Sequence, residues 1–428
     1  MEDILNIQDK YGVDESIKEY DYVEHLPSSG CDLNMAGQIS IPIENADVFL
    51  HPHHSWLLFE GELKKADDTR YPDNALATLT NNAMMYLFTN IRYNLGGQEI
   101  ESLNHPGFAT TMMGLVKQSL DFAKGSGMMS CWRPDTTTAA ADDNKGFAAR
   151  RNFIINSSDP KGSFSFGVPL QAIFGFCEDF TKITYGMRHR LVLVRGDDSN
   201  AIFRHNGVAA GKVTLSKISW MMPRVYPNDE AKYALYKTIE NNKAVLDVAF
   251  RMHQCNITEL PANTTTHSWR LGVKTAPEKP RYVIVGIQRA KADNQVANAS
   301  IFDHSSVVNM SVVLNSTKYP TLDVNANFAS NKFAPFYKYM TEFKRDYYGL
   351  DPIFDCSAIS PHQYKDLFPI FVFNVSRQSE RLASGVVDMT VEMKFGENIQ
   401  ANTKAYAIVI SDRRLKLESD GKKMNVIY

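Results

Sequence analysis

The stretch NIRYNLGGQEIESLNHPGFATTMMGLVKQSL, which runs from Asn90 to Leu120, decides the fold. Apolar residues alternate with polar ones from Ile91 to Leu95, as they do in a half-buried strand. Gly96-Gly97 can supply the positive φ angles of a tight hairpin turn, and a mostly polar strand returns after it. Beyond Asn104, a candidate helix cap, apolar residues recur at helical spacing: Phe108, Met112, Leu115, Val116 and Leu120. The stretch therefore predicts a hairpin followed by an amphipathic helix.

The same order occurs a second time. The segment NMSVVLNSTKY, from Asn309 to Tyr319, aligns without a gap with Asn90–Ile100, and Asn315-Ser316 replaces the Gly-Gly turn. A stripe of apolar residues at helical spacing follows here too: Phe333, Phe336, Tyr337, Met340, Phe343 and Tyr347. We expect this helix to begin near Pro335, to end by Gly349 and to pack its stripe against a sheet. A unit that recurs at half-chain spacing predicts two copies of one β-rich module.

Strand signals fill the remainder of both halves. In the first half they lie at 39–43, 56–59, 152–155, 163–166, 188–194 and 212–222, beside the hairpin, and 169–174 predicts a short helix. In the second half they lie at 245–252, 268–273, 281–288, 306–314, 369–375, 386–395 and 405–410. Each half thus has about eight strands, the number in a jelly roll. We predict an all-β protein of two tandem eight-stranded jelly rolls, with short helices inserted in loops.

These signals divide the chain into five parts. We predict an acidic N-terminal arm at 1–36, a first jelly roll at 37–226, a linker helix at 227–243 capped by Asn228, a second jelly roll at 244–412, and a basic C-terminal tail at 413–428. The arm has nine acidic residues, two lysines and no persistent apolar period. It fits a segment that orders only against a partner, or a frayed terminus. The tail contains five cations, which favour a solvated segment over a nucleic-acid contact: Arg413, Arg414, Lys416, Lys422 and Lys423.

The composition is that of a soluble globular chain. Its 428 residues suffice for two domains of roughly 200 residues each, and 44% are apolar and 22% charged. The formal net charge of −2 provides no basic field for nucleic acid. Five scattered cysteines without a CxxC pair argue against a disulfide framework or a zinc site. The start, MEDILNIQDKYGVDE, lacks the pattern of a signal peptide, and no apolar run predicts a transmembrane segment.

Clusters of polar residues offer no clear chemistry. His51-Pro52-His53-His54 lacks a fourth metal ligand nearby, so a polar loop is the favoured interpretation. Asp142-Asp143 and Asp197-Asp198 lie beside turn residues rather than forming a glycosidase pair, and Arg150-Arg151 is too short for a nucleic-acid patch. The sequence has no nucleophile elbow, Walker loop or dinucleotide fingerprint. We therefore predict no catalytic, cofactor-binding or metal-binding residue and no enzymatic activity.

Three stretches carry a family resemblance: IENADVFLHPHHSWLLFEGEL (43–63), NIRYNLGGQEIES (90–102) with the helix after it, and FDHSSVVNMSVVLNSTKYP (302–320). They resemble the double jelly-roll major capsid proteins, above all those encoded by Polinton/Maverick elements and adintoviruses. These belong to the lineage that includes adenovirus-like and phycodnavirus-like capsids. The likeness covers most of residues 37–412 and leaves out the acidic arm and the basic tail.

This resemblance implies two upright jelly rolls in a homotrimer of pseudo-hexagonal outline, which tiles an icosahedral shell around double-stranded DNA. It implies a place in the virion and contacts with neighbouring trimers, penton proteins and minor capsid proteins, without sequence-specific nucleic-acid binding. Without a signal peptide, assembly is expected inside the host cell. The alternative is a two-domain β-sandwich that binds or hydrolyses glycans. A cleft with two carboxylates about 5 to 9.5 Å apart would mark a hydrolase.

Overall fold

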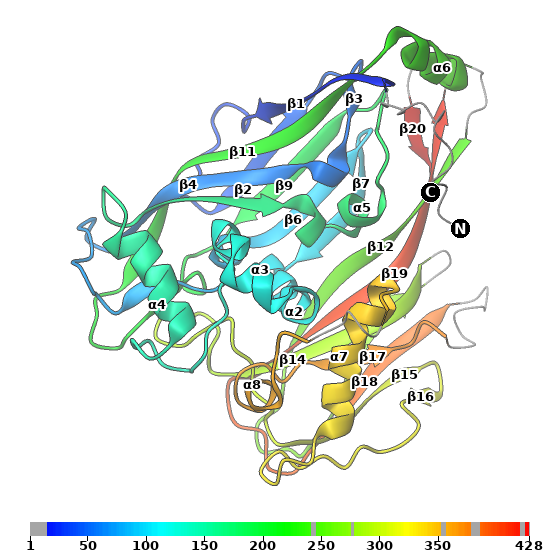
Figure 1. The fold of residues 1–428 in the computed structure, drawn as a ribbon. Coiled ribbons are helices and arrows are strands. Elements are labelled where there is room, and N and C mark those ends of the chain that lie inside the picture. The colour runs from blue at the N-terminus through cyan, green and yellow to red at the C-terminus, as the bar shows by residue number, and fades with distance from the viewer. Residues whose placement is uncertain are drawn as a thin grey trace, which may run out of the picture.

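The computed structural model describes residues 15–240, 245–274, 278–351, 357–377, 386–419 and 424–427. It contains two β-sandwiches, one formed by the first half of the chain and one by the second (Figure 1). Helix α6 (Asp229–Glu240) lies between them in the sequence, and Asn228 caps it by accepting a hydrogen bond from the Ala231 nitrogen at 2.7 Å. The predicted linker helix is therefore present.

The first sandwich has two main sheets. One contains, in spatial order, β1 (Ile17–His25), β11 (Gly211–Pro227), β4 (Trp56–Lys65) and β8 (Ser163–Pro169), and β3 (Phe49–Leu50) also pairs with β11. The other contains β2 (Gly37–Ile43), β9 (His189–Arg195), β6 (Phe88–Leu95) and β7 (Gln98–Asn104). A small sheet of β5 (Ala77–Leu79) and β10 (Ile202–Arg204) is added at one end.

The second sandwich repeats this plan. One sheet contains β12 (Val245–Glu259), β19 (Thr403–Ser419), β14 (Lys279–Arg289) and β17 (Phe371–Asn374), with β20 (Met424–Ile427) paired to β19. The other contains β13 (Thr266–Lys274), β18 (Val387–Phe395), β15 (Val307–Leu314) and β16 (Thr317–Tyr319).

The two sandwiches share one connectivity. If the eight strands shared by the two plans are numbered in chain order within each half, both halves have one sheet ordered 1-8-3-6 and one ordered 2-7-4-5. The additional strands β3, β5, β10 and β20 lie outside this scheme. Two sheets that exchange strands in this order, twice in one chain, make a double jelly roll. The predicted fold class is confirmed.

Both predicted hairpins are present. Gly96 and Gly97 turn β6 into β7 with φ angles of 59° and 87°, and Asn315 turns β15 into β16 with a φ of 53°. The matched asparagines have matched roles, since each donates to a side chain fourteen residues further along the sequence. The Asn90 amide donates to the Asn104 side chain at 2.8 Å, and the Asn309 amide donates to Asp323 at 2.7 Å.

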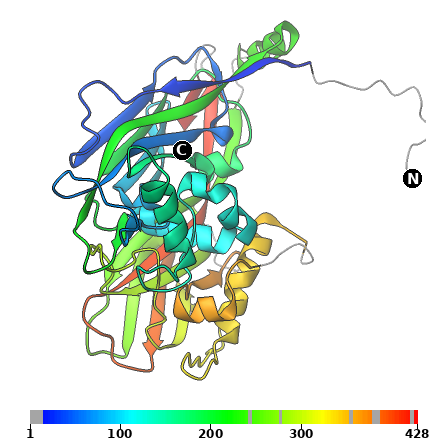
Figure 2. The same cartoon turned by 60° about the vertical axis from the view of Figure 1, so that its left-hand side comes forward.

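The helices other than α6 are gathered on one side of the two sandwiches (Figure 2). Those of the first half are α1 (Ala83–Tyr86), α2 (Pro106–Lys117), α3 (Leu120–Lys124), α4 (Lys145–Arg151) and α5 (Gly175–Asp179), and those of the second are α7 (Ala334–Tyr348) and α8 (Pro361–Asp366). Helix α7 begins and ends as predicted, and its buried stripe packs on β17: Phe336, Met340, Phe343 and Tyr347. Within the described residues, no helix is long and apolar enough to cross a bilayer.

Helix α2 differs from the amphipathic helix predicted after the first hairpin. It ends at Lys117, and Leu120 is exposed at the start of α3. From Pro106 to Met113 every residue of α2 is buried, because the helix lies between the two jelly rolls rather than on the surface of one. A helix covered on all sides carries no polar stripe.

The predicted acidic arm contains a strand. Ile17–His25 forms β1 and pairs antiparallel with β11, so it supplies the first strand of the first jelly roll. Nearly all of its side chains are exposed on both faces. Backbone hydrogen bonds hold it at the sheet edge, and an edge strand without a buried face has no apolar period in its sequence. Residues 1–14 lie outside the described residues.

The run at 152–155 is helical rather than a strand. Asn152–Asn156 forms a π-helical turn that continues α4, and the adjacent Ile154 and Ile155 are both buried. Adjacent residues of a helical turn can both face the core, whereas in a half-buried strand only every second residue is buried. The predicted count of eight strands in the first half was reached by including this turn and omitting β1.

The described parts of the predicted basic tail, 413–419 and 424–427, are also strands. β19 continues through Arg413 to Ser419, where Leu415 and Leu417 are buried and Arg414 and Lys416 are exposed. Arg414 and Lys416 therefore occupy the outer face of the strand. The apolar residues alternate with them, but the charges made the segment look like a solvated tail. Lys422 and Lys423 lie outside the described residues.

Candidate functional site

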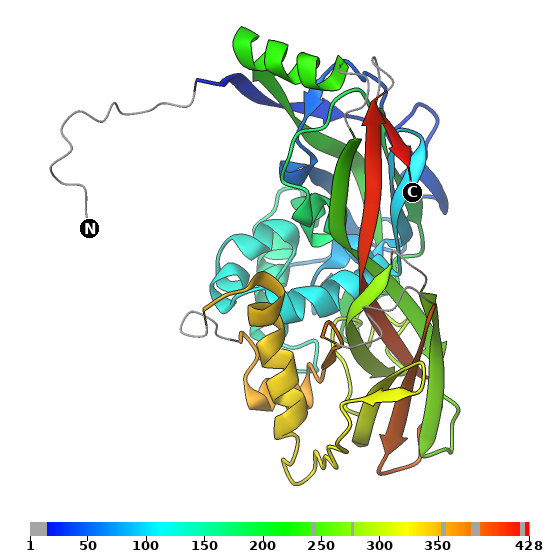
Figure 3. The same cartoon turned by 90° about the vertical axis from the view of Figure 1, so that its right-hand side faces the viewer.

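The two jelly rolls meet along a buried junction. Strands β12 and β19 of the second sandwich extend beside β7, α2 and α5 of the first, and α2 also contacts α7 (Figure 3). β12 and β19 are the longest pair in the second half, with fifteen and seventeen residues. The junction therefore sets how the two halves of the chain are oriented.

One carboxylate lies at the centre of the junction. Glu101 of β7 has a relative exposure of 1%. Its Oε1 accepts hydrogen bonds from the backbone nitrogens of Gly175 at 3.1 Å and His253 at 2.9 Å, and its Oε2 accepts one from Phe176 at 3.0 Å. Burial raises the pKa of Glu101 to about 7, although the three amide donors act in the opposite direction. A single side chain thus joins the backbones of α5 and β12.

Gly175 allows this close approach. A Cβ atom at position 175 would overlap the carbonyl oxygen of Arg251 on β12. The backbone of α5 can therefore lie directly against β12 only because this residue has no side chain. At the neighbouring position the ring of Phe176 packs edge-on against Phe250, with centroids 5.6 Å apart.

Buried ion pairs surround this contact. The Lys117 ammonium at the end of α2 lies 2.8 and 2.7 Å from the two oxygens of Glu178, and these oxygens also accept hydrogen bonds from the hydroxyls of Tyr348 at 2.6 Å and Tyr347 at 2.8 Å. Burial alone would raise the pKa of Glu178, but the neighbouring Lys117 lowers it to about 2. Lys117 and Glu178 belong to the first jelly roll, and the tyrosines belong to α7 of the second.

A second ion pair crosses the junction beside the first. Arg251 of β12 binds Asp179 of α5, with its Nε 2.9 Å from Oδ2, and its guanidinium lies 3.6 Å from the ring centroid of Tyr347. Its Nη1 donates to the Tyr347 carbonyl at 2.6 Å. These paired charges fix the position of α5 relative to β12 and α7, because any displacement would leave a buried charge without a partner.

Apolar packing closes the rest of the junction. Phe108 of α2 stacks on Tyr406 of β19 with ring centroids 4.1 Å apart. Tyr86 donates its hydroxyl hydrogen to the Ala299 carbonyl at 2.9 Å. A Cβ at Gly286 of β14 would lie 2.7 Å from Met112 of α2, so this glycine is also required by close packing.

A further buried ion pair involves Arg150, one of the predicted dibasic pair. Its side chain is fully buried, and its Nη2 lies 2.9 Å from Asp135 Oδ2. Asp135 also accepts a hydrogen bond at 2.9 Å from Asn298 of the second half. Arg151 pairs with Asp142 at 2.6 Å. These arginines are therefore structural residues.

The histidine cluster forms a short 3-10 turn, Pro52–His54, between β3 and β4. His53 Nδ1 lies 2.8 Å from the Cys177 carbonyl oxygen, and His51 Nε2 lies 3.3 Å from that of Thr181. The aspartates at 197–198 are engaged locally, since Asp198 pairs with Arg195 and Asp197 accepts from the Ser199 nitrogen at 2.7 Å. In the described ranges, no group of three His, Cys, Asp or Glu side chains could hold a metal ion.

The residues that make the junction were not found from the sequence. Glu101 belongs to the hairpin strand that was interpreted as mostly polar, yet it is buried, which is rare for a carboxylate. Glu178-Asp179 and Arg251 are separated by about seventy residues and meet only through the fold. The one available signal was Gly175, which lies between two aromatic residues in FGFCED (174–179).

Comparison with known proteins identifies the family to which this fold belongs. A model of the double jelly roll-like domain matches residues 77–415, most of the chain. The chain belongs to this family. Solved structures of viral capsid proteins share its fold at low sequence identity. The Faustovirus major capsid protein has 10% identity and a TM-score of 0.58, over 97% of this chain and 92% of that one.

Two further structures are similar over nearly the whole length. The mavirus major capsid protein has 12% identity and a TM-score of 0.53, over 100% of this chain and 94% of its own. The PBCV-1 virus capsid has 12% identity and a TM-score of 0.53, over 99% of both chains. No curated protein sequence matches the chain. At these identities the likeness is one of fold, and the narrower likeness to Polinton/Maverick and adintovirus proteins stays a prediction.

Proposed function

We propose that this double jelly-roll protein is a major capsid protein whose homotrimers tile an icosahedral shell around double-stranded DNA. The observation that carries the proposal is the pair of jelly rolls with one strand order, held in a fixed orientation by the buried junction around Glu101. The similar structures are capsid proteins by name, which supports the same role here.

Geometry connects the junction to assembly. Three chains with two similar modules each place six modules around one axis, so a threefold trimer has a nearly hexagonal outline. Closure is heterologous, since the first module of one chain must contact the second module of the next. Such a ring closes only if the angle between the modules is the same in every chain. The buried ion pairs of Glu178 and Arg251 would supply that rigidity.

The role is structural rather than enzymatic. In this proposal the chain contributes surfaces to trimer closure, to neighbouring trimers, and to penton and minor capsid proteins. An obligate trimer interface should bury more than about 2,000 Å² per pair of chains. The net charge of −2 suits a shell that surrounds DNA without binding particular sequences. The protein would then reside in the virion and assemble inside the host cell.

The test is the state of the purified protein. We expect a species of three times the 48.2 kDa chain mass in analytical ultracentrifugation, and hexagonal particles or closed shells in electron micrographs. A control at low concentration separates trimers from aggregates, because an obligate trimer persists on dilution. A protein that remains a monodisperse monomer at all concentrations would contradict the proposal.

A further inference from the structure

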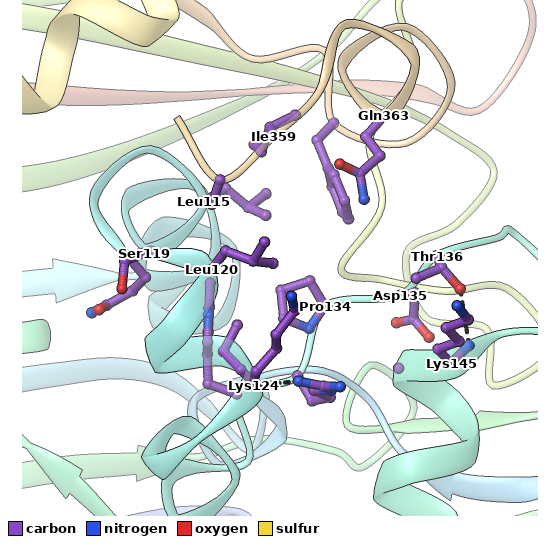
Figure 4. A pocket seen from close by; sticks show the side chains of 18 residues that line it. Leu115, Ser119, Leu120, Lys124, Pro134, Asp135, Thr136, Lys145, Ile359 and Gln363 are labelled. Atoms are coloured by element: carbon purple, nitrogen blue, oxygen red, sulfur yellow. Dashed lines mark hydrogen bonds between the residues drawn. The ribbon is translucent and has the colours of Figure 1, made fainter. Parts of the chain in front are cut away.

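A cleft of about 150 Å³ opens between the inserted helices of the first jelly roll and α8 of the second. Figure 4 shows Leu115 and Leu120 on one side, Ile359 above and Pro134 below. Trp132 and Phe368 complete an apolar lining. Leu120 is 48% exposed, a high value for a leucine in a cleft wall. The cleft therefore presents apolar surface to solvent at a place where both jelly rolls contribute.

Cations surround this apolar surface. Lys124, Arg133 and Lys145 line the cleft, and among the described residues none of them has a carboxylate partner. Arg133 donates to the Ala123 carbonyl at 2.8 Å, which fixes its guanidinium at the wall. The one carboxylate in the lining, Asp135, is paired with Arg150. The cleft thus combines an apolar interior with a net positive lining.

The chain itself contains a segment of matching chemistry. Residues 1–14, MEDILNIQDKYGVD, carry four acidic residues and one lysine around the apolar residues Ile4, Leu5 and Ile7. We propose that the cleft binds residues 1–14 of a neighbouring copy of this chain. The apolar residues would enter the cleft, and Glu2, Asp3 and Asp9 would face the lysines and the arginine.

The position of β1 sets how far residues 1–14 can reach. Ile17, at the start of β1, pairs with Pro227 beside α6. Figures 1 to 3 are related by turns about the vertical axis, and α6 lies at the top in each while α8 lies in the lower half. Fourteen residues reach at most about 45 to 50 Å when fully extended. The choice of a neighbouring chain rests on the proposed trimer, in which the next chain lies alongside.

The expected affinity is low for an isolated segment and higher in an assembly. Ordering fourteen residues is costly, so a few apolar contacts and exposed ion pairs give weak binding to a free peptide. Within a trimer or shell the segment is held near the cleft, which raises its effective concentration. Exposed ion pairs are screened by salt, so binding should weaken as ionic strength rises.

Photo-crosslinking on the full chain tests this proposal. Leu5 is replaced by p-benzoylphenylalanine, and chains labelled with ¹⁴N and ¹⁵N are mixed before assembly. We expect crosslinks from residue 5 to 114–136 or 357–368, joining chains of different isotope. The double substitution K124E/K145E should lower their yield at least fivefold. The matched control K182E/K237E, at exposed lysines outside the cleft, should leave the yield unchanged.

Three outcomes would overturn the proposal: crosslinks to other surfaces, crosslinks within one chain only, or a yield that K124E/K145E does not lower. Sedimentation of the same samples separates this inference from the proposed function. Trimers without cleft crosslinks overturn the docking of residues 1–14 and leave the assembly proposal standing. Chains that remain monomeric overturn the assembly proposal itself, and the docking with it.

Discussion

The carboxylate of Glu101 lies 2.9 Å from the backbone nitrogen of His253, although the two residues belong to different jelly rolls. Glu101 lies in the returning strand of the first hairpin, and His253 lies in the first strand of the second sandwich. A buried acceptor that joins two backbones is costly to displace, because the donors and the carboxylate would all lose their partners. The orientation of the modules is therefore fixed by main-chain contacts as well as by side-chain packing.

The pKa of Glu101 predicts a pH dependence of stability. Burial raises it from the usual 4.5 to about 7, so folding takes up a proton between these values. The contribution of Glu101 to the free energy of unfolding is then highest below pH 4.5, falls as pH rises through this window, and is constant above about 7. The fall is on the order of 3 kcal/mol. Urea unfolding at pH 5 and pH 7.5 measures it.

The control for this prediction is E101Q, which cannot ionise. Burial lowers the pKa of His253 to about 4 and that of His189 to about 3, so the contribution of these histidines to the free energy of unfolding rises with pH across this window, with the opposite sign. Since both proteins contain these histidines, the difference between wild type and E101Q isolates Glu101. Parallel pH profiles for the two proteins would show that Glu101 ionises freely in the folded state.

Gly175 predicts a steric effect on assembly. In G175A the new Cβ overlaps the Arg251 carbonyl, so α5 and β12 must separate. We expect a loss of at least about 2 kcal/mol in the free energy of unfolding and a sharp drop in trimer yield by sedimentation. G37A is the matched control, because a Cβ at that strand residue meets nothing within 4 Å. Equal trimer yields for the two variants would show that this approach does not govern assembly.

The ion pair of Lys117 and Glu178 predicts that removing one charge lowers the free energy of unfolding more than removing both. Both side chains are about one-tenth exposed, so E178A leaves a nearly buried ammonium without a partner and should cost about 3 to 5 kcal/mol. The double variant K117M/E178Q removes both charges and keeps an acceptor for the two tyrosine hydroxyls. It should lose less than half as much stability in urea unfolding. A double variant that loses as much stability as E178A would mean that the unpaired charge is not the cause of the loss in E178A.

The N-terminal segment predicts different results for two truncations. Deleting residues 1–14 leaves β1 in place, so we expect trimers of normal stability that close shells poorly. Deleting residues 1–30 also removes β1 and exposes the edge of β11. That variant should aggregate or unfold at lower urea concentration. Electron micrographs and sedimentation distinguish the two, and normal shells after deletion of 1–14 would show that the segment has no role in assembly.

Local patterns predicted the parts of the fold that are local. The turn at Gly96-Gly97, its counterpart at Asn315 and the stripe of α7 depend on φ angles and on spacing within about fifteen residues, so the sequence contains them directly. Their recurrence at half-chain spacing was enough to identify two modules. The count of about eight strands in each half then predicted a jelly roll, although composition and period do not contain the order of the strands within the sheets.

The elements that were missed depend on distant partners. β1 is a strand because β11 lies beside it, and it buries almost nothing. The end of β19 is a strand because β12 pairs with it, about 170 residues away. Glu101, Glu178 and Arg251 form one site only after both jelly rolls are folded. No local period marks residues whose environment is created by the rest of the chain.

The length of β12 and β19 has a consequence for how the protein can be divided. Their ladder runs unbroken from Val245 paired with Glu418 to Glu259 paired with Lys404, and it spans the level of both sandwiches. If the gene were split at α6, the amino-terminal fragment would lack Tyr406, which covers Phe108. The carboxyl-terminal fragment would expose the apolar residues of β12 that the first sandwich buries. Neither fragment should stay in solution alone. The two sandwiches repeat one fold, but neither can be expressed as a soluble fragment without the other.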